Sequence, residues 1–308
     1  MQPLLTTGLR AESTEFRGLS AFSQIYRPEL HLKDRGPMTR NEKRGLGADE
    51  GSAPTIQQTK NFSIMLNWAK FRIRKALGLE FNILERKVIE VENIRELRKL
   101  FDWDREALLD DPRLDDFDYP EDLNMRRLHD AEVIGTVMAN VRPDRALEIG
   151  TAEGRTTALM AANSPDTEIY TINIPPEDLA RGEGGELTTG ALDINEIGAY
   201  YREQGCQNVH QILVNTSTWV PDIGSLGVTF IDGCHDAKFV YGDTVKALSI
   251  SEPGSFILWH DFNFQLVKTY HWIYDVCLGV EELYRTKRLS GRIYHLRDSW
   301  VGLYRVSG

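Results

Sequence analysis

Between residues 145 and 306, apolar runs of strand length alternate with segments of helical period or with polar loops. RALEIG (145–150), EIYTINI (168–174), VHQILV (209–214), VTFIDG (228–233) and SFILWHD (255–261) are the first runs of this series. Continuously apolar runs suit strands that are buried on both faces, and alternation with helices implies right-handed crossovers. The sequence therefore predicts a doubly wound, mainly parallel α/β sheet with helices on both faces.

The last two apolar runs break this rhythm. GRIYHL (291–296) and WVGLYRV (300–306) are separated only by RDS, which is too short for a crossover helix. Two strands joined in this way must pair antiparallel. With the helical segment RRLHDAEVIGTVMANV (126–141) in front, the sequence predicts a seven-stranded sheet that ends in an antiparallel hairpin.

The residues that precede the sheet predict a helical, partly flexible N-terminal extension. Residues 61–79 have the pattern of an amphipathic basic helix, which either docks on its own domain or binds a membrane surface or a partner. Residues 101–130 are strongly acidic and predict a solvated connector, with a cation-binding loop as the alternative. We expect a flexible segment at 1–60, a lid or oligomerisation element at 61–125 and the α/β domain at 126–308.

Charge and cysteine usage limit the class of function. The formal charge of −10 argues against nucleic-acid binding, which depends on clustered Lys and Arg. The cysteines, Cys206, Cys234 and Cys277, are far apart and odd in number, so we expect neither a disulfide framework nor a cysteine zinc site. No run approaches the roughly 18 apolar residues of a membrane span, and the N-terminus has no signal-like segment. We expect a cytoplasmic protein without a nucleic-acid partner or a membrane span, and a homodimer stays open.

A glycine-containing turn, ALEIGTAEGRTT (146–157), follows the first strand. Ligands of open parallel sheets bind beyond the carboxyl ends of the strands, so Gly150 and Gly154 belong where a ligand would lie. A dinucleotide fingerprint needs a third glycine, which is missing, and the carboxylate of Glu148 would repel a phosphate. These features favour a positively charged ligand and disfavour the alternative of a nicotinamide-dependent oxidoreductase.

The segment from Glu148 to Gly154, EIGTAEG, resembles the first motif of class I S-adenosylmethionine-dependent methyltransferases. Residues 126–306 are also similar to the Rossmann-like sheet and final hairpin of that family. The resemblance implies S-adenosylmethionine as the cofactor. It implies that Gly150, Thr151 and Gly154 line the methionine part of the cofactor, with Glu148 near it.

Three further cofactor positions follow from the same resemblance. The end of the second strand usually carries an acidic residue for the ribose hydroxyls, whereas this chain has Asn173, whose amide oxygen is a weaker acceptor. Thr216 lies in NTST (215–218), where the family contacts adenine, although an ordinary polar turn is the alternative reading. Asp232 is expected beside the cofactor.

Four ionisable residues follow the fourth and fifth apolar runs: Asp232, His235, His260 and Asp261. They should emerge at one edge of the sheet, next to the cofactor. Asp is seldom buried unless it is paired, so we expect a solvated or metal-filled cleft.

This spacing resembles metal-dependent O-methyltransferases of the catechol and antibiotic-sugar types. The resemblance implies that Asp232, His260 and Asp261 hold Mg²⁺ or another divalent cation and that His235 is the general base. A histidine ligand favours manganese, iron or zinc over magnesium. A site without metal stays open, with the Asp side chains bonded to turn amides and His235 as a surface or cofactor-contacting residue.

The sequence thus predicts a methyltransferase that methylates a hydroxyl of a small-molecule acceptor, of the kind found in secondary metabolism. The alternative from another class is a catalytically silent methyltransferase-like module that binds a ligand or partner. The loop at 175–190 either closes over the site or is a long insertion. The aromatic residues after the fifth strand either frame the substrate or pack in the core: Trp259, Phe262, Phe264, Tyr270 and Trp272.

Overall fold

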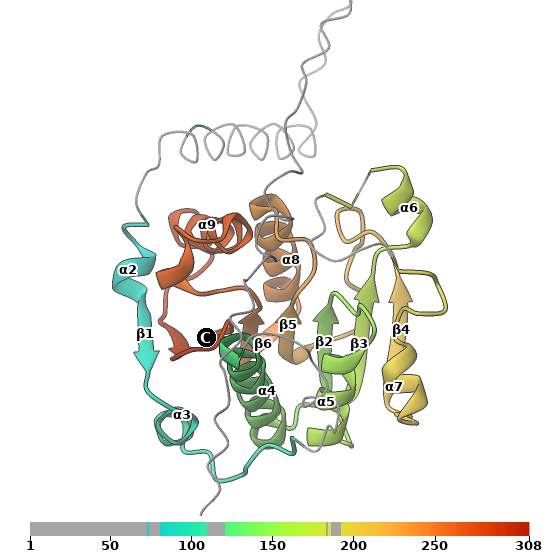
Figure 1. Ribbon diagram of the computed structural model, residues 1–308, viewed down its shortest axis with the longest axis horizontal. Coiled ribbons are helices and arrows are strands. Elements are labelled where there is room, and N and C mark those ends of the chain that lie inside the picture. Colours follow the sequence, from blue (N-terminus) through green and yellow to red (C-terminus); the bar gives the residue numbers. More distant parts are fainter. Residues whose placement is uncertain (1–72, 74–80, 110–120, 183, 186–191, 308) are drawn as a thin grey trace, which may run out of the picture. The chain divides into compact units, whose positions relative to one another are not determined.

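The computed structural model describes residues 73, 81–109, 121–182, 184–185 and 192–307. In this part of the chain, eight strands form one mixed sheet with the order β1-β7-β8-β6-β5-β2-β3-β4 (Figure 1). All seven predicted strands are present, and β1 is an additional one. The strands are β1 (Val88–Val91), β2 (Arg145–Ile149), β3 (Glu168–Asn173), β4 (Val209–Leu213), β5 (Leu226–Ile231), β6 (Ser251–Trp259), β7 (Ile293–Leu296) and β8 (Gly302–Arg305).

The pairing of the strands confirms the predicted fold class. Strands β2 to β6 are parallel to one another, and β8 is antiparallel to both β6 and β7. Ile149 of β2 lies opposite Ile172 of β3 and Ile231 of β5, and Ile231 lies opposite Trp259 of β6. Because these strands end nearly level, the residues that follow them emerge together at the carboxyl edge of the sheet.

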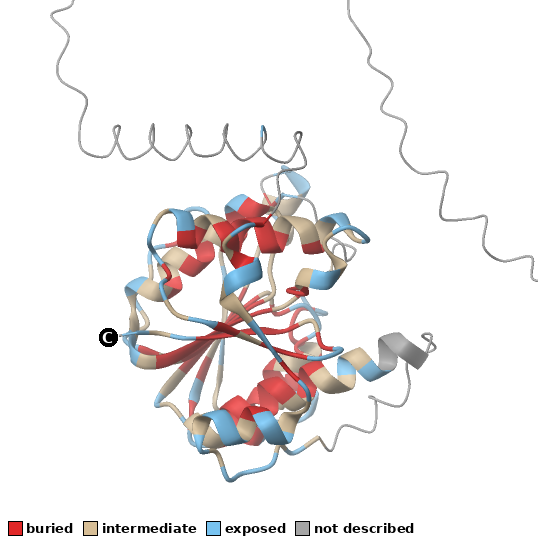
Figure 2. Cartoon of the chain, turned by 90° about the vertical axis from the view of Figure 1, so that its left-hand side faces the viewer, coloured by how far each residue is buried: buried red, intermediate tan, exposed pale blue. Residues whose placement is uncertain are grey.

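Helices cover both faces of the sheet, as the side view in Figure 2 shows. The buried residues of α8 and α9 form one core with the neighbouring strands, and those of α3, α4 and α5 form a second core. No helix in the described residues is long and apolar enough to cross a membrane. The helices are α2 (Leu84–Lys87), α3 (Ile94–Phe101), α4 (Glu121–Val141), α5 (Arg155–Asn163), α6 (Pro176–Ala180), α7 (Ala199–Glu203), α8 (Ala237–Ser249), the 3₁₀ helix η2 (Phe264–Leu266) and α9 (His271–Arg285).

Strand β1 extends the sheet beyond the predicted hairpin, where it pairs parallel with β7. The backbone N–H of Leu84 donates to the buried carboxylate of Glu281 at 2.9 Å, which joins α2 to α9. The proposed flexible segment at 1–60 lies outside the described residues, as does the basic helix at 61–79 except for Ile73. The domain boundaries at residues 60 and 126 stay predictions.

Part of the acidic segment at 101–130 is not a solvated connector. Residues 110–120 lie outside the described residues, but α4 already begins at Glu121. Asp130 on this helix is only 5% exposed. The prediction was wrong here because it used charge alone, whereas α4 packs against the sheet and supplies partners for this carboxylate.

The backbone of Gly150 passes very close to the end of β5. Gly150 has φ of +107°, and a Cβ at this position would lie 2.0 Å from the carbonyl oxygen of Asp232. The N–H of Asp232 in turn donates to the carbonyl of Ile149 at 2.8 Å. Glycine is therefore required at residue 150 by the chain itself, before any ligand is considered.

We expect Gly150→Ala to lower the free energy of unfolding by more than the roughly 1–2 kcal/mol that a left-handed conformation alone costs an L-residue. The matched control is Gly182→Ala, because Gly182 has φ of +77° but no atom within 4 Å of the added Cβ. Urea unfolding of the two variants measures the difference. Equal losses would contradict a steric role for Gly150.

Candidate active site

A cavity lies at the carboxyl edge of the sheet, where β2, β3, β4 and β5 end. Of the predicted cofactor-binding residues, Gly150, Asn173, Thr216 and Asp232 line it. Glu148, Thr151 and Gly154 are not among its lining residues. The structure therefore brings together residues from four strand ends, and it places three residues of the first motif elsewhere.

Asn173 connects the turn after β2 to the end of β3. Its Oδ1 accepts a hydrogen bond from the backbone N–H of Ala152 at 3.2 Å, and its Nδ2 donates to the carbonyl of Ile174 at 3.0 Å. These two bonds fix the orientation of the amide at the cavity wall. A carbonyl oxygen has two lone pairs, so Oδ1 can accept a further hydrogen bond.

Glu148 is buried below the turn and does not present an open negative charge there. It is 1% exposed and accepts hydrogen bonds from the hydroxyls of Thr157 and Thr171, the latter at 2.6 Å. Burial raises the pKa of Glu148 to about 8, against the effect of the two hydroxyl donors, and the charge of Asp232 adds to the rise. The structure thus shows Glu148 bonded within the chain, because β2 is covered on both faces. Its place near the methionine part of the cofactor stays a prediction.

Thr151 and Gly154 serve contacts within the chain. The hydroxyl of Thr151 is 2.7 Å from that of Thr171 and accepts a hydrogen bond from Gln211 Nε2 at 3.0 Å. A Cβ on Gly154 would lie 2.6 Å from the ring of Tyr201. Contacts within the chain are therefore enough to explain why threonine stands at position 151 and glycine at position 154.

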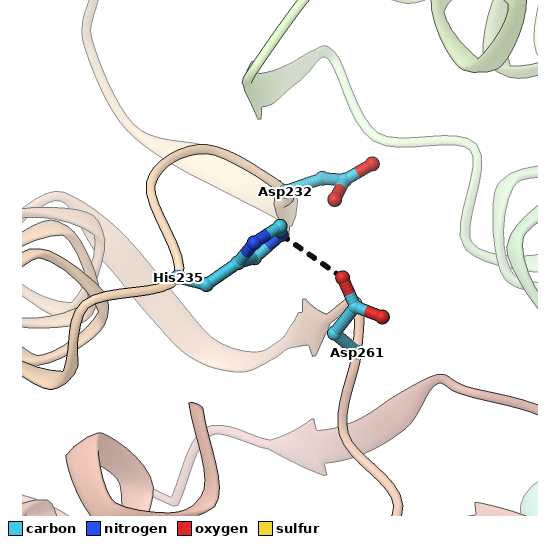
Figure 3. Close-up of side chains that lie close together, drawn as sticks. All are labelled: Asp232, His235 and Asp261. Carbon is cyan, nitrogen blue, oxygen red and sulfur yellow. Dashed lines mark ion pairs between the residues drawn. The ribbon is translucent and has the colours of Figure 1, made fainter. Parts of the chain in front are cut away.

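Asp232, His235 and Asp261 form a compact group beside the cavity (Figure 3). One potential ligand atom from each residue lies within 4.8 Å of the others. Asp232 directly follows β5, and His235 lies in the loop that leads into α8. Nε2 of His235 is 2.9 Å from Oδ2 of Asp261, close enough for an ion pair when the imidazole is protonated.

The group is electrostatically coupled through Asp261. This residue is 5% exposed, and its Oδ1 also accepts a hydrogen bond from Trp272 Nε1 at 3.2 Å. Burial opposes its charge, but His260 and His235 more than compensate and hold its pKa well below the usual range. Burial likewise opposes the charge on His235, yet the bond to Asp261 and its negative charge raise the pKa of His235 above the ordinary value.

His260 lies between three carboxylates. Its Nδ1 is 3.1 Å from Oδ1 of Asp232 and 3.5 Å from Oδ2 of Asp261, and its Nε2 is 3.4 Å from Oδ2 of Asp130. Burial opposes the charge, but Asp232 and Asp261, together with Asp130, raise the pKa of His260 well above its usual value. Both ring nitrogens of this predicted metal ligand therefore face carboxylates.

Asp130 is a site residue that the sequence analysis missed. Its Oδ1 accepts a hydrogen bond from the backbone N–H of Trp300 at 2.6 Å, so it joins α4 to the hairpin as well as to His260. A signal was present: Val133, Ile134 and Val137 follow at the spacing of a helix face, and all are buried. The position of Asp130 on that apolar face indicated a buried, paired carboxylate.

The donor atoms of the group fit a divalent cation. Asp232 and Asp261 offer carboxylate oxygens, and the third member of the compact group is His235. The predicted metal-ligand roles of Asp232, His260 and Asp261 stay predictions. Such a mixed oxygen and nitrogen set suits manganese, iron or zinc as well as or better than magnesium, which prefers oxygen alone.

Comparison with known proteins agrees with the sequence motif. Residues 147–262 match a family model described as a methyltransferase domain. This match confirms the resemblance of that segment to class I S-adenosylmethionine-dependent methyltransferases. No curated protein is significantly similar to the chain in sequence.

Several solved structures have a similar arrangement of elements. A proposed O-methyltransferase from Klebsiella pneumoniae is 18% identical, with 70% of this chain and 96% of that chain covered and a TM-score of 0.45. The O-methyltransferase TomG from Streptomyces achromogenes, involved in tomaymycin synthesis, is 17% identical, with 62% and 91% covered and a TM-score of 0.41. The methyltransferase PaMTH1 from Podospora anserina is 17% identical, with 62% and 89% covered and a TM-score of 0.41. Similarity at this level carries no conclusion about the substrate of this chain.

We expect Glu148→Gln to change how stability depends on pH. The pKa of Glu148 rises from 4.5 to about 8 on folding, so the folded protein binds this proton more tightly than the unfolded chain. The wild type therefore loses stability, by up to about 1.4 kcal/mol per pH unit, as the pH rises between these two values. The variant lacks this loss, so its stability relative to the wild type should increase between about pH 5 and pH 8. Urea unfolding at several pH values tests this, and parallel curves would contradict it.

Proposed function

We propose that the chain is an S-adenosylmethionine-dependent O-methyltransferase that methylates a hydroxyl of a small molecule with the help of a divalent cation. One observation carries the proposal: Asp232 belongs both to the wall of the cavity and to the compact group with His235 and Asp261. An acceptor held at that group would therefore lie next to a cofactor in the cavity.

The cavity residues offer suitable contacts for the cofactor, which supplies a methyl group on a sulfonium. Gly150 provides a wall without a side chain, and Asn173 provides an oriented amide for a hydroxyl group. The carboxylate of Asp232 provides a negative charge near the end of β2, which favours a positively charged donor. Thr216 follows β4, which is separated by β2 and β3 from β5, the strand that Asp232 follows.

Asp232 and Asp261 would hold the cation, with an imidazole as a further ligand. When bound, the cation lowers the pKa of an acceptor hydroxyl placed against it. His235 is the proposed base that removes the hydroxyl proton, and Asp261 orients the ring and stabilises the imidazolium that forms. The compact geometry also supports the alternative that His235 is itself the third ligand, since His260 faces Asp130 with its other nitrogen.

The surroundings of Asp261 support an acceptor with an apolar or aromatic body. Trp259 and Phe262 are fully buried and belong to the core. Tyr270 and Trp272 are only half-buried, their rings are 4.8 Å apart, and Trp272 donates to Asp261. The proposed acceptor is a hydroxylated small molecule of the secondary-metabolite type, used in a cytoplasmic setting.

The competing proposal is a silent methyltransferase-like module. It is favoured by the ion pairs of His260 with Asp130 and Asp232, because a protonated imidazole between carboxylates already balances charge without a metal. Measured methyl transfer separates the two proposals.

We expect the purified protein to transfer labelled methyl groups from S-adenosylmethionine to at least one member of a panel of phenols, sugars and hydroxy acids. Transfer should depend on added Mn²⁺ or Mg²⁺ and stop in excess chelator. Asp232→Asn should lower the rate by about 100-fold or more, the usual effect of losing a group that acts in the transition state. The matched control is Asp222→Asn on an exposed residue. Cofactor binding without transfer to any acceptor would favour the silent module.

The two roles of His235 predict different results for His235→Ala. If His235 is the base, turnover falls about 100-fold while the affinity for Mn²⁺, measured by calorimetry, stays unchanged. If it is a ligand, Mn²⁺ affinity itself falls. His210→Ala on an exposed histidine is the control. Unchanged turnover and unchanged Mn²⁺ affinity would exclude both roles.

A further inference from the structure

A second carboxylate, Asp243 of α8, lines the same cavity and has no assigned role. It is only 2% exposed. The cavity wall also includes the apolar residues Ile174, Val214 and Phe239. A buried carboxylate in such surroundings is costly unless hydrogen-bond donors face it, so its partners need to be identified.

Two groups of the chain interact with the carboxylate of Asp243, but together they stabilise its charge less than water would. The side chain of Thr216 forms a hydrogen bond with the carboxyl group, and the ammonium of Lys246 attracts it. Lys246 also donates to the carbonyl of Thr216, so part of its hydrogen-bonding capacity is used elsewhere. Burial outweighs both partners and raises the pKa of Asp243 to about 6. A further donor arriving from the cavity would therefore stabilise this carboxylate.

The order of the strands tells which part of a ligand would meet Asp243. Its partner Thr216 follows β4 at the edge of the sheet, whereas Asp261 follows β6. Asp232 follows β5, and strands β2 and β3 lie between β5 and β4, which separates the ends of β5 and β4 by about 14 Å at roughly 4.8 Å per strand. If the sulfonium lies near Asp232 and the ribose meets the amide of Asn173 at the end of β3, the group that the ribose carries lies further along the row of strand ends, near Thr216 and Asp243. That group is the nucleobase.

We propose that Asp243 accepts a hydrogen bond from the exocyclic amino group of the adenine and so selects adenine over purines that carry an oxo group there. The inference rests on the proposed function, because it assumes S-adenosylmethionine in the cavity. An ionised carboxylate only accepts hydrogen bonds. It matches the amino group of adenine and repels the carbonyl oxygen that hypoxanthine has at the same place. Phe239 offers an apolar surface for the purine ring.

A purely structural role for Asp243 predicts a different result. The hydrogen bond between Asp243 and Thr216 joins α8 to the loop after β4, and its loss would weaken all ligands to the same degree. A selecting role changes the ratio of two affinities. Comparing two ligands that differ only in the purine substituent therefore separates the roles.

The experiment measures, by calorimetry, the dissociation constants of S-adenosylhomocysteine and S-inosylhomocysteine for the full-length protein. The wild type should prefer the adenine ligand by about tenfold or more, as expected for a hydrogen bond to a charged group. In Asp243→Asn the preference should fall toward one, since an amide can accept from the amino group or donate to the oxo group. Lys246→Met, which removes the attracting ammonium but keeps the carboxylate, should retain the preference. Asp236→Asn at the start of the same helix, outside the cavity lining, should leave it unchanged.

The other outcomes contradict either the role of Asp243 or the proposed function. A wild type that binds both ligands equally, or an Asp243→Asn variant that keeps the full preference, overturns the role of Asp243 and leaves the proposed function in place. A wild type that binds neither ligand overturns the proposed function, and the role of Asp243 with it. Because the wild-type ratio alone can contradict the inference, the test does not depend on whether Asp243→Asn folds.

Discussion

The close approach of β2 and β5 at their carboxyl ends determines where everything else in the site lies. The carbonyl of Asp232 occupies the space that a side chain on residue 150 would need, and the N–H of Asp232 bonds to Ile149. This contact holds Asp232 at the cavity wall. The N–H of His260 donates to the carbonyl of Ile231 at 3.0 Å, so β6 delivers His260 and Asp261 at the same level. A larger residue at 150 would separate the two strand ends and so the cavity from the ionisable group.

Charge balance extends the site beyond the segment that matches a methyltransferase domain. Asp130 on α4 precedes residues 147–262, and Trp300 in the hairpin loop follows them, yet the two are bonded to each other, and Asp130 also lies next to His260. Burying carboxylates and imidazoles together is stabilising only when each meets an opposite charge or a donor. The helix and the hairpin are therefore part of the electrostatic environment of the candidate site.

The sequence was sufficient to predict the sheet because its signal is local: apolar runs form buried strands, and a three-residue link forces a hairpin. It was also sufficient to bring Asp232, His235, His260 and Asp261 together, since parallel strands end at one edge. It did not predict strand β1, which has only four residues, two of them exposed. It also missed Asp130 and the burial of Glu148, because their environment comes from residues that are distant in sequence, and charge alone suggested exposure.

The negative charge in the cavity comes from Asp232 and Asp243 and not from Glu148, and this determines which ligands the cavity favours. Glu148 was expected to repel phosphates, but it is buried outside the cavity lining and its pKa is raised to about 8. Asp232 and Asp243 line the cavity instead, one near the ionisable group and one near the end of β4. Two carboxylates at separate points of one cavity disfavour the pyrophosphate of a nicotinamide dinucleotide, whose two charges would lie between them. A ligand with a sulfonium near Asp232 and an adenine amino group near Asp243 meets both carboxylates favourably, and S-adenosylmethionine carries both groups.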